Sequence, residues 1–237
     1  MTNKYKRVLL KLSGESLVGS EKFGYNQETV NSIVDEIKKL HEQDVEIAIV
    51  VGGGNICRGK SLANHGVDPA TADYMGMMAT IMNALYLQDV LKSKGMDNRV
   101  MTAIGVNEVA EPFIRLKALK HLDKKRIVIL AAGTGNPFST TDTAAALKAK
   151  ELNCDVIIKA TKVDGIYDKD PKITGAIKYD TLTYMDAITQ KLEVMDMTAF
   201  TMCHDFKIPI IVCDVMGKDN LANIVKGKQI GTIVQSV

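Results

Sequence analysis

The sequence contains no long apolar run that could cross a membrane. Its N-terminal stretch turns polar after a few apolar residues, too early for the apolar part of a signal peptide. No apolar run elsewhere approaches the length of about 18 residues that marks a membrane-spanning helix. We therefore expect a protein that is neither exported nor inserted in a membrane.

Net charge is also nearly absent. The 30 Lys and Arg residues almost balance the 28 Asp and Glu residues, which leaves +2. No overall field therefore draws the chain to nucleic acid or to anionic lipid, and any basic chemistry must be local. We expect neither nucleic acid nor a membrane among its partners.

The four cysteines lack the paired spacing of a zinc or redox motif. They are Cys57, Cys154, Cys203 and Cys213. Cys154 and Cys213 lie within apolar runs that read as strands. This pattern favours reduced, buried thiols in a cytoplasmic protein over a disulfide or zinc framework.

Short β-branched runs alternate with longer helical patterns along the chain. This alternation predicts an α/β fold built from βαβ units around a mainly parallel sheet. The 237 residues suit one large domain or two smaller ones. Strands are expected at residues 7–12, 46–51, 99–102, 126–131, 155–159, 209–213 and 232–234. Helices are expected from Asn26 to about Leu40 and at residues 74–94, 111–122, 142–152 and 196–206, with Pro112 in the first turn of the third.

One polar stretch, residues 163–180, is unusually long for a loop in a compact domain. It contains Gly165, Pro171 and Gly175. Such loops are commonly functional. It is interpreted as a lid or a nucleotide-binding edge, or as a boundary between two lobes.

Three glycine-rich stretches stand where predicted strands end, at residues 10–14, 51–55 and 131–142. The carboxyl ends of parallel strands line one crevice, so these stretches can meet although they are far apart in sequence. Glycine lets backbone N–H groups approach an anion closely, and a following helix N-terminus adds partial positive charge. Together they predict a site for a polyphosphate.

Lys11 is the charged residue closest to the first glycine turn. It alternates with apolar neighbours on a predicted strand. One interpretation is a lysine that reaches out to solvent from a sheet edge. The other places its ammonium group between the β and γ phosphates of a nucleotide, where it takes up charge that develops in the transition state.

Residues 54–61, GNICRGKS, match the P-loop pattern and make a P-loop nucleotidase the alternative. A P-loop lysine needs an uninterrupted helix that starts at the GK[ST] residues. Gly66 and Pro69 fall within the second and third turns of such a helix and end it. We therefore favour Arg58 over Lys60 as the phosphate ligand, because a guanidinium forms two parallel bonds to phosphate.

Two polar segments complete the candidate site. In TGNPFSTTD, either Thr140 or Thr141 caps the next helix, and Asp142 either holds Mg²⁺ through water or orients Lys11. After the strand at 155–159, polar residues flank an adenine and ribose or form an ordinary turn. These residues are Lys159, Thr161, Asp164, Tyr167 and Asp170.

The motifs KLSGE, GGGNICRG, DYMGMMAT, GTGNPFSTTD and KATKVDGIYDKDP occur in the order and spacing of the bacterial uridylate (UMP) kinases, a branch of the amino acid kinase family. The chain resembles these enzymes from Lys6 to its C-terminus. The second and third glycine motifs together distinguish them from aspartate, glutamate and carbamate kinases of the same fold. The resemblance implies transfer of the ATP γ-phosphoryl group to UMP, with Mg²⁺ carried by ATP and no direct protein ligand to the metal.

The resemblance also implies roles for individual residues. Those expected to bind ATP are Lys11, Leu12, Ser13, Gly14, Gly54, Arg58, Thr161, Tyr167 and Asp170. Those expected to bind UMP are Gly53, Asp73, Thr134, Gly135, Asn136, Pro137, Phe138, Ser139, Thr140 and Thr141. Lys11, Arg58 and Asp142 are expected to surround the transferred phosphoryl group, with Lys159 as a further catalytic candidate.

Fold, assembly and regulation follow from the same resemblance. It implies one domain over residues 1–237, a three-layer αβα sandwich whose N-terminal part mainly binds the acceptor and whose C-terminal part mainly binds ATP. It implies a homohexamer activated by GTP and inhibited by UTP, with the effector response linked to Gly19, Ser20, Glu21, Lys22, Phe23 and Gly24. Cys57 and Ser139 depart from the family pattern, which usually has larger apolar or aromatic side chains there.

Overall fold

The computed structural model describes residues 3–236 apart from 59–61, 63–64 and 193. The strands are β1 (Arg7–Leu12), β2 (Glu46–Val51), β3 (Asn98–Thr102), β4 (Glu111–Pro112), β5 (Ile127–Ala131), β6 (Val156–Thr161), β7 (Ile166–Tyr167), β8 (Lys178–Tyr179), β9 (Thr181–Thr183), β10 (Ile210–Asp214) and β11 (Thr232–Gln235). The helices are η1 (Gly14–Leu17), α1 (Gln27–His41), α3 (Pro69–Ser93), α4 (Arg115–Asp123), α5 (Thr141–Glu151), α6 (Tyr184–Thr189), α7 (Met197–Phe206) and α8 (Asn220–Val225).

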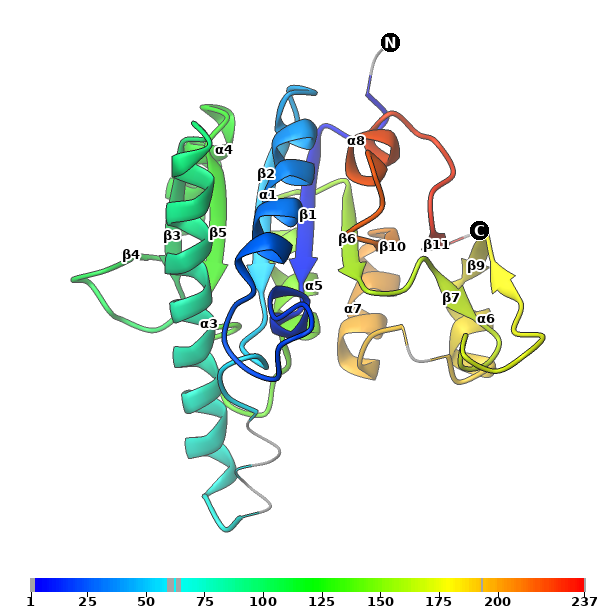
Figure 1. The fold of residues 1–237 in the computed structure, drawn as a ribbon, viewed down its shortest axis with the longest axis horizontal. Coiled ribbons are helices and arrows are strands. Elements are labelled where there is room, and N and C mark those ends of the chain that lie inside the picture. The colour runs from blue at the N-terminus through cyan, green and yellow to red at the C-terminus, as the bar shows by residue number, and fades with distance from the viewer. Residues whose placement is uncertain (1–2, 59–61, 63–64, 193, 237) are drawn as a thin grey trace.

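The described strands form one large sheet and one small hairpin. The large sheet has the order β4-β3-β5-β2-β1-β6-β10-β11-β9, and only the β10–β11 pair is antiparallel. β1 lies in its interior between β2 and β6. The carboxyl ends of β1, β2, β5 and β6 therefore share one edge, which is the lower edge in Figure 1.

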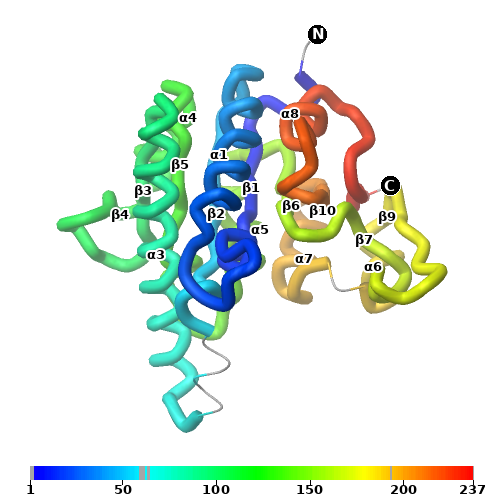
Figure 2. The backbone as a smooth tube through the Cα atoms, in the orientation of Figure 1, coloured from blue at the N-terminus to red at the C-terminus, as the bar shows by residue number. Residues whose placement is uncertain are grey.

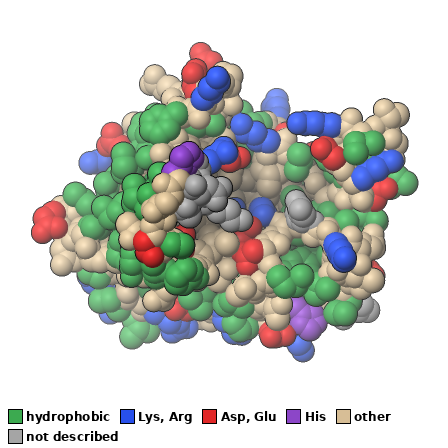
Figure 3. Space-filling model, turned by 90° about the horizontal axis from the view of Figure 1, so that it is seen from below, with side chains coloured by type: hydrophobic (Ala, Val, Ile, Leu, Met, Phe, Trp, Pro, Cys, Tyr) green, Lys and Arg blue, Asp and Glu red, His purple; other side chains and the backbone are tan. Residues whose placement is uncertain are grey.

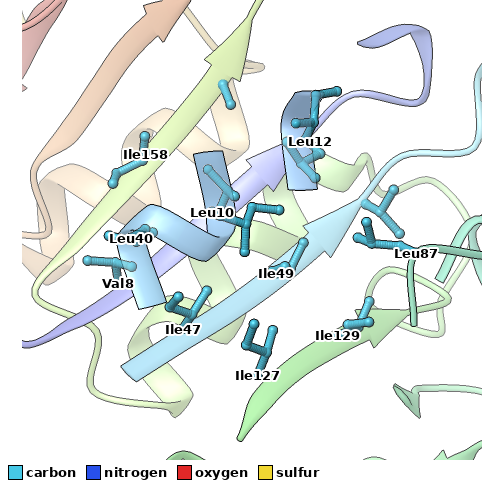
Figure 4. Packing of buried hydrophobic residues seen from close by; sticks show 14 of the residues in the cluster. Val8, Leu10, Leu12, Leu40, Ile47, Ile49, Leu87, Ile127, Ile129 and Ile158 are labelled. Carbon is cyan, nitrogen blue, oxygen red and sulfur yellow. The ribbon is translucent and has the colours of Figure 1, made fainter. Parts of the chain in front are cut away.

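Helices cover both faces of the sheet. Val8, Leu10 and Leu12 of β1 face α1, α3 and α8, and Figure 4 shows this side, with Leu40 and Leu87 among its residues. Leu9 of β1 points to the opposite face, where α4, α5 and α7 pack. The prediction of a three-layer αβα sandwich around a mainly parallel sheet is confirmed.

Local sequence signals account for the helix α1. The side chain of Asn26 accepts a hydrogen bond from the backbone N–H of Thr29 at 2.9 Å, which satisfies one free donor of the first turn. The apolar residues that recur along the helix, from Val30 to Leu40, are buried against the sheet. This helix begins and ends where the sequence predicts.

Two predicted helices have different beginnings in the structure. Residues 111–112 pair with β3 as the edge strand β4, so Pro112 is not in a helical first turn, and α4 begins only at Arg115. Proline is tolerated there because an edge strand does not need its N–H for the sheet. α3 begins at Pro69, earlier than predicted, because Asp68 caps it by accepting from Thr71 N at 3.0 Å.

The long polar stretch folds into the small hairpin β7–β8 and leads into β9 and α6. β9 pairs with β11 at the end of the large sheet. Figure 2 traces this segment along that end of the molecule.

None of the helices in the described part of the chain has both the length and the hydropathy that crossing a membrane requires.

Candidate functional site

Lys11 and Lys159 are neighbours on adjacent parallel strands. They are register partners on β1 and β6, so both side chains point to the face covered by α5 and α7. Both stand near the carboxyl end of their strand, and only 8% of the Lys11 side chain and 17% of the Lys159 side chain are exposed. Two ammonium groups are thus buried side by side at the sheet edge.

Asp142 lies between the two lysines. It stands in the first turn of α5, where a negative charge is favoured by the helix dipole. Its Oδ2 atom accepts a hydrogen bond from Lys159 Nζ at 2.8 Å. Its Oδ1 atom lies 2.8 Å from Lys11 Nζ in an ion pair that is not aligned as a hydrogen bond. Of the two roles predicted for Asp142, the geometry supports orienting Lys11.

Charge and burial compete in this cluster. Burial alone would raise the pKa of Asp142, but the charges of Lys11 and Lys159 outweigh it, so the pKa of the carboxyl lies below its usual value. Burial lowers the pKa of Lys159, and Asp142 opposes this. The cluster holds two positive charges and one negative charge, which leaves it ready to accept an anion.

The first and second glycine turns touch through their backbones. A Cβ atom on Gly14 would lie only 2.6 Å from the backbone N of Gly54, so no larger residue fits without a shift. Arg58 follows this second turn and forms an ion pair with Glu15 at 2.7 Å. In this structure Arg58 contacts Glu15 and Gly54 and is not joined to the lysine cluster. Its predicted place beside the transferred group therefore requires it to leave Glu15.

The second turn also packs closely on α3. A Cβ atom on Gly53 would approach Gly76 O to 2.8 Å and Ala79 Cβ to 2.9 Å. The first turns of α3 project beyond the sheet edge, as Figure 1 shows. Gly53 therefore fixes the distance between the glycine turn and α3.

The variant Gly53→Ala is expected to push α3 away from the glycine turn. Overpacking of this kind costs about 1–3 kcal/mol of unfolding free energy. Urea unfolding measures this cost. Gly105→Ala is the matched control, because a Cβ atom there meets nothing within 4 Å. Equal stability of the two variants would contradict the tight packing.

The third glycine stretch closes a smaller cavity of about 130 Å³ against α3. Asp73 Oδ2 accepts from Phe138 N at 2.7 Å, and Thr80 Oγ1 accepts from Ala132 N at 2.7 Å. The cavity is lined by Gly53, Cys57, Ala72, Asp73, Gly76, Met77, Thr80, Gly133, Thr134, Ser139, Thr140 and Thr141. Most residues predicted to bind UMP therefore meet here, whereas Gly135, Asn136, Pro137 and Phe138 form the loop beside it.

A larger cavity of about 520 Å³ meets the cluster at Lys159. Lys159, Thr161, Tyr167 and Asp170 line it, together with the hairpin segment and residues 190–192 and 194. This supports the interpretation of the polar stretch as a binding edge. Asp164 forms hydrogen bonds with Tyr167 Oη at 2.7 Å and with Lys178 at 3.0 Å, which ties the hairpin together. Figure 3 views the hollowed edge from below, with acidic and basic side chains around the hollow.

Other predicted residues have different surroundings. The Leu12 side chain is fully buried in the core on the α1 side, so only its backbone can face a ligand at the sheet edge. Ser13 caps η1 and accepts from Ser16 N at 3.1 Å. The segment 19–24 is held at both ends: Gly19 O accepts from Lys162 Nζ at 3.2 Å, and Gly24 N donates to Asn55 O at 3.0 Å.

Two buried polar residues and one partly buried one, which hold the site, were missed from the sequence. Asn55 and Asn83 exchange side-chain hydrogen bonds of 3.0 and 2.6 Å, and Asn83 also donates to Gly52 O at 2.6 Å. They lock the second glycine turn to α3. The third is Asp196, which caps α7. A polar residue inside the apolar pattern of α3 was the available signal for Asn83.

Fold and site together define an α/β protein with a buried cluster of net positive charge beside two cavities. The chain belongs to the amino acid kinase family, which it matches over residues 6–214. It is similar to the crystal structure of UMP kinase from Bacillus anthracis, with 40% identity and a TM-score of 0.94 over 98% of this chain and 96% of that one.

Two further solved structures are similar over nearly the whole chain. UMP kinase from Ureaplasma parvum has 33% identity and a TM-score of 0.91, covering 98% of this chain and 100% of that chain. Uridylate kinase from Archaeoglobus fulgidus has 31% identity and a TM-score of 0.73, covering 96% and 99%. The P-loop lysine, Lys60, lies outside the described residues, and membership of the amino acid kinase family argues against that alternative.

Proposed function

We propose that this protein transfers the γ-phosphoryl group of ATP to UMP, giving UDP and ADP, in pyrimidine nucleotide biosynthesis. The observation that carries the proposal is the cluster of Lys11, Asp142 and Lys159 between two cavities. Lys159 lines the larger cavity. Thr140 and Thr141, which directly precede Asp142, line the smaller one. Similarity to UMP kinases over nearly the whole chain supports UMP as the acceptor.

ATP is assigned to the larger cavity and UMP to the smaller one. The acceptor side is then built mainly from the N-terminal part of a single domain and the ATP side mainly from the C-terminal part. The glycine turns at Gly14, Gly53 and Gly54 place backbone N–H groups near the phosphates. Arg58 exchanges Glu15 for a phosphate when the nucleotides bind.

Chemistry at this site requires placement and charge neutralisation rather than a covalent intermediate. Lys11 and Lys159 neutralise oxygens of the transferred group, and Asp142 keeps the two ammonium groups aimed at one point. The acceptor is already a phosphate dianion, so no general base is needed. The chain itself supplies no nucleophile in this proposal.

Mg²⁺ fits this site as a companion of ATP. It would neutralise charge on the nucleotide phosphates when bound. Asp142 is engaged by two lysines and is not free to act as a direct ligand. We therefore assign no protein side chain as a direct ligand of the metal.

Assembly and regulation extend the proposal. A homohexamer is supported by exposed apolar side chains along α3, among them Tyr74, Met78 and Met82. GTP activation and UTP inhibition are proposed from the family resemblance, with residues 19–24, which are bonded to Lys162 and Asn55, as the segment that carries the effector response. Four free cysteines support a cytoplasmic location.

A coupled assay of ADP release tests the acceptor. With Mg²⁺ and ATP, turnover is expected with UMP, less with CMP, and none with aspartate or glutamate, because a site that hydrogen-bonds a nucleotide rejects acceptors without those groups. The variant Lys60→Ala is expected to keep this activity. A preference for an amino acid would contradict UMP as the acceptor, and complete loss of activity in Lys60→Ala would favour a P-loop enzyme.

A further inference from the structure

Asp196 joins the beginnings of two helices, α5 and α7. Its Oδ1 atom accepts from Ala199 N at 3.0 Å and so caps α7. The same carboxylate accepts from the hydroxyl of Thr143 on α5, at 3.1 and 3.2 Å. Its Oδ2 atom also accepts a short hydrogen bond from the hydroxyl of Thr140, the N-cap of α5. One carboxylate therefore ties α5 to α7.

The bond to Asp196 decides what the Thr140 hydroxyl can do. A hydroxyl has one proton to donate and two lone pairs to accept with. Thr140 Oγ1 accepts from Asp142 N and from Thr143 N, each at 3.1 Å. Its proton is then directed to Asp196, which is charged and closer than the Thr143 hydroxyl at 3.4 Å. Asp196 thus fixes the N-cap that places Asp142.

The same segment also holds Lys159. Lys159 Nζ donates to Val194 O at 2.5 Å as well as to Asp142. The charges of Asp142, Lys11 and Asp196 act on Lys159, and the charge of Asp196 raises the pKa of Lys159 against the lowering effect of burial. Val212, its register neighbour on β10, is apolar. Burial raises the pKa of Cys203 on α7 to about 12, so this thiol adds no charge.

We propose that Asp196 is a positioning residue for phosphoryl transfer, which sets Asp142 through the Thr140 hydroxyl. Asp196 does not line either cavity, so it acts through these residues rather than on a nucleotide. The proposal rests on the proposed kinase activity and adds a residue that ties the beginning of α7 to the N-cap of α5.

The variant Asp196→Asn separates this role from helix capping. Asparagine caps a helix about as well as aspartate, so α7 remains stable. The new amide N–H₂ faces the Thr140 hydroxyl, whose lone pairs are already used, and the negative charge near Lys159 is lost. We expect kcat to fall on the order of a hundredfold, the cost of a small misplacement of reacting groups. Binding of a non-hydrolysable ATP analogue, measured by calorimetry, should change little.

The pH profile gives a readout that a purely structural residue would not move. kcat/KM reports groups of the free enzyme and falls at alkaline pH as Lys159 loses its proton. Without Asp196 the pKa of Lys159 falls further, so the alkaline limb should shift to lower pH. Asp186→Asn is the matched control, because Asp186 is an exposed residue whose carboxylate accepts from Thr183 N in the capping box of α6 and lies outside both cavities.

The outcomes are distinguishable. The proposal is supported if the wild type phosphorylates UMP, if Asp196→Asn has a lower kcat and an alkaline limb at lower pH, and if Asp186→Asn keeps the wild-type kcat and pH profile. If the wild type is active and Asp196→Asn has the same kcat and the same alkaline limb, the role of Asp196 is overturned and the kinase assignment stays intact. If Asp196→Asn and Asp186→Asn lose the same share of kcat, Asp196 acts only as an ordinary helix cap, and the proposed positioning role is also overturned. A wild type that ignores UMP but phosphorylates another acceptor refutes only the acceptor, and the variants are then compared with that acceptor.

Discussion

Replacing Lys11 with alanine is expected to raise the barrier to phosphoryl transfer by about 3–4 kcal/mol, the usual cost of losing one preorganised charge-stabilising donor. Lys11 sits at the carboxyl end of β1 with its ammonium group 2.8 Å from Asp142. The group is buried, so its interaction with phosphate oxygens is little screened by water. The measurement is kcat at saturating ATP and UMP.

The fold of the Lys11→Ala variant should survive, because Asp142 keeps Lys159 as a partner. Lys148→Ala is the matched control: this lysine is equally buried and pairs with Glu151 at 2.7 Å, at the other end of α5. It should keep normal turnover. Near-normal turnover of Lys11→Ala would remove Lys11 from the catalytic centre.

The variant Asp142→Asn is expected to lose both activity and stability. Two buried ammonium groups then lack their shared counter-charge, and breaking a buried ion pair costs about 3–5 kcal/mol of unfolding free energy. Only 14% of the Asp142 side chain is exposed, so water cannot replace the lost charge well. Urea unfolding at pH 7 measures the cost. Asp123→Asn, which breaks an exposed pair with Arg7, should change stability little.

The pH dependence of this loss has a defined sign. In the wild type the pKa of Asp142 is lowered on folding, so its stabilisation is present above the unfolded carboxyl pKa and is lost as pH falls through the folded value. In Asp142→Asn the pKa of Lys159, already lowered by burial, falls further. The unfolded state then binds more protons, so stability should rise with pH up to the unfolded lysine pKa of about 10.4. If the difference in unfolding free energy between the wild type and Asp142→Asn does not shrink at alkaline pH, the loss of stability is not caused by charge.

The sequence was sufficient for features that local chemistry controls. The strands of the sheet centre are mainly apolar runs, and parallel pairing requires their carboxyl ends to meet. That rule alone brings Lys11, the glycine turns and Asp142 to one edge. The helix signal at Asn26 was equally reliable, because its cap involves only residues three positions apart.

Features that depend on tertiary pairing were not predictable from local patterns. Strands as short as β7, β8 and β9 have no periodicity to detect. The backbone angle of Pro112 suits the start of a helix, yet Pro112 lies in the edge strand β4 because this segment pairs with β3. Asp196 looks like an ordinary helix cap in the sequence, and its bonds to Thr140 and Thr143 cross more than 50 positions of chain.

A structure of the protein with UMP, Mg²⁺ and a non-hydrolysable ATP analogue is the most direct test of one shared centre for two nucleotides. The γ-phosphate should lie within hydrogen-bond distance of Lys11 Nζ and point toward the UMP phosphate, with adenosine in the larger cavity and uridine in the smaller one. A γ-phosphate bound at Lys60, or nucleotides that do not face each other across Asp142, would contradict the account.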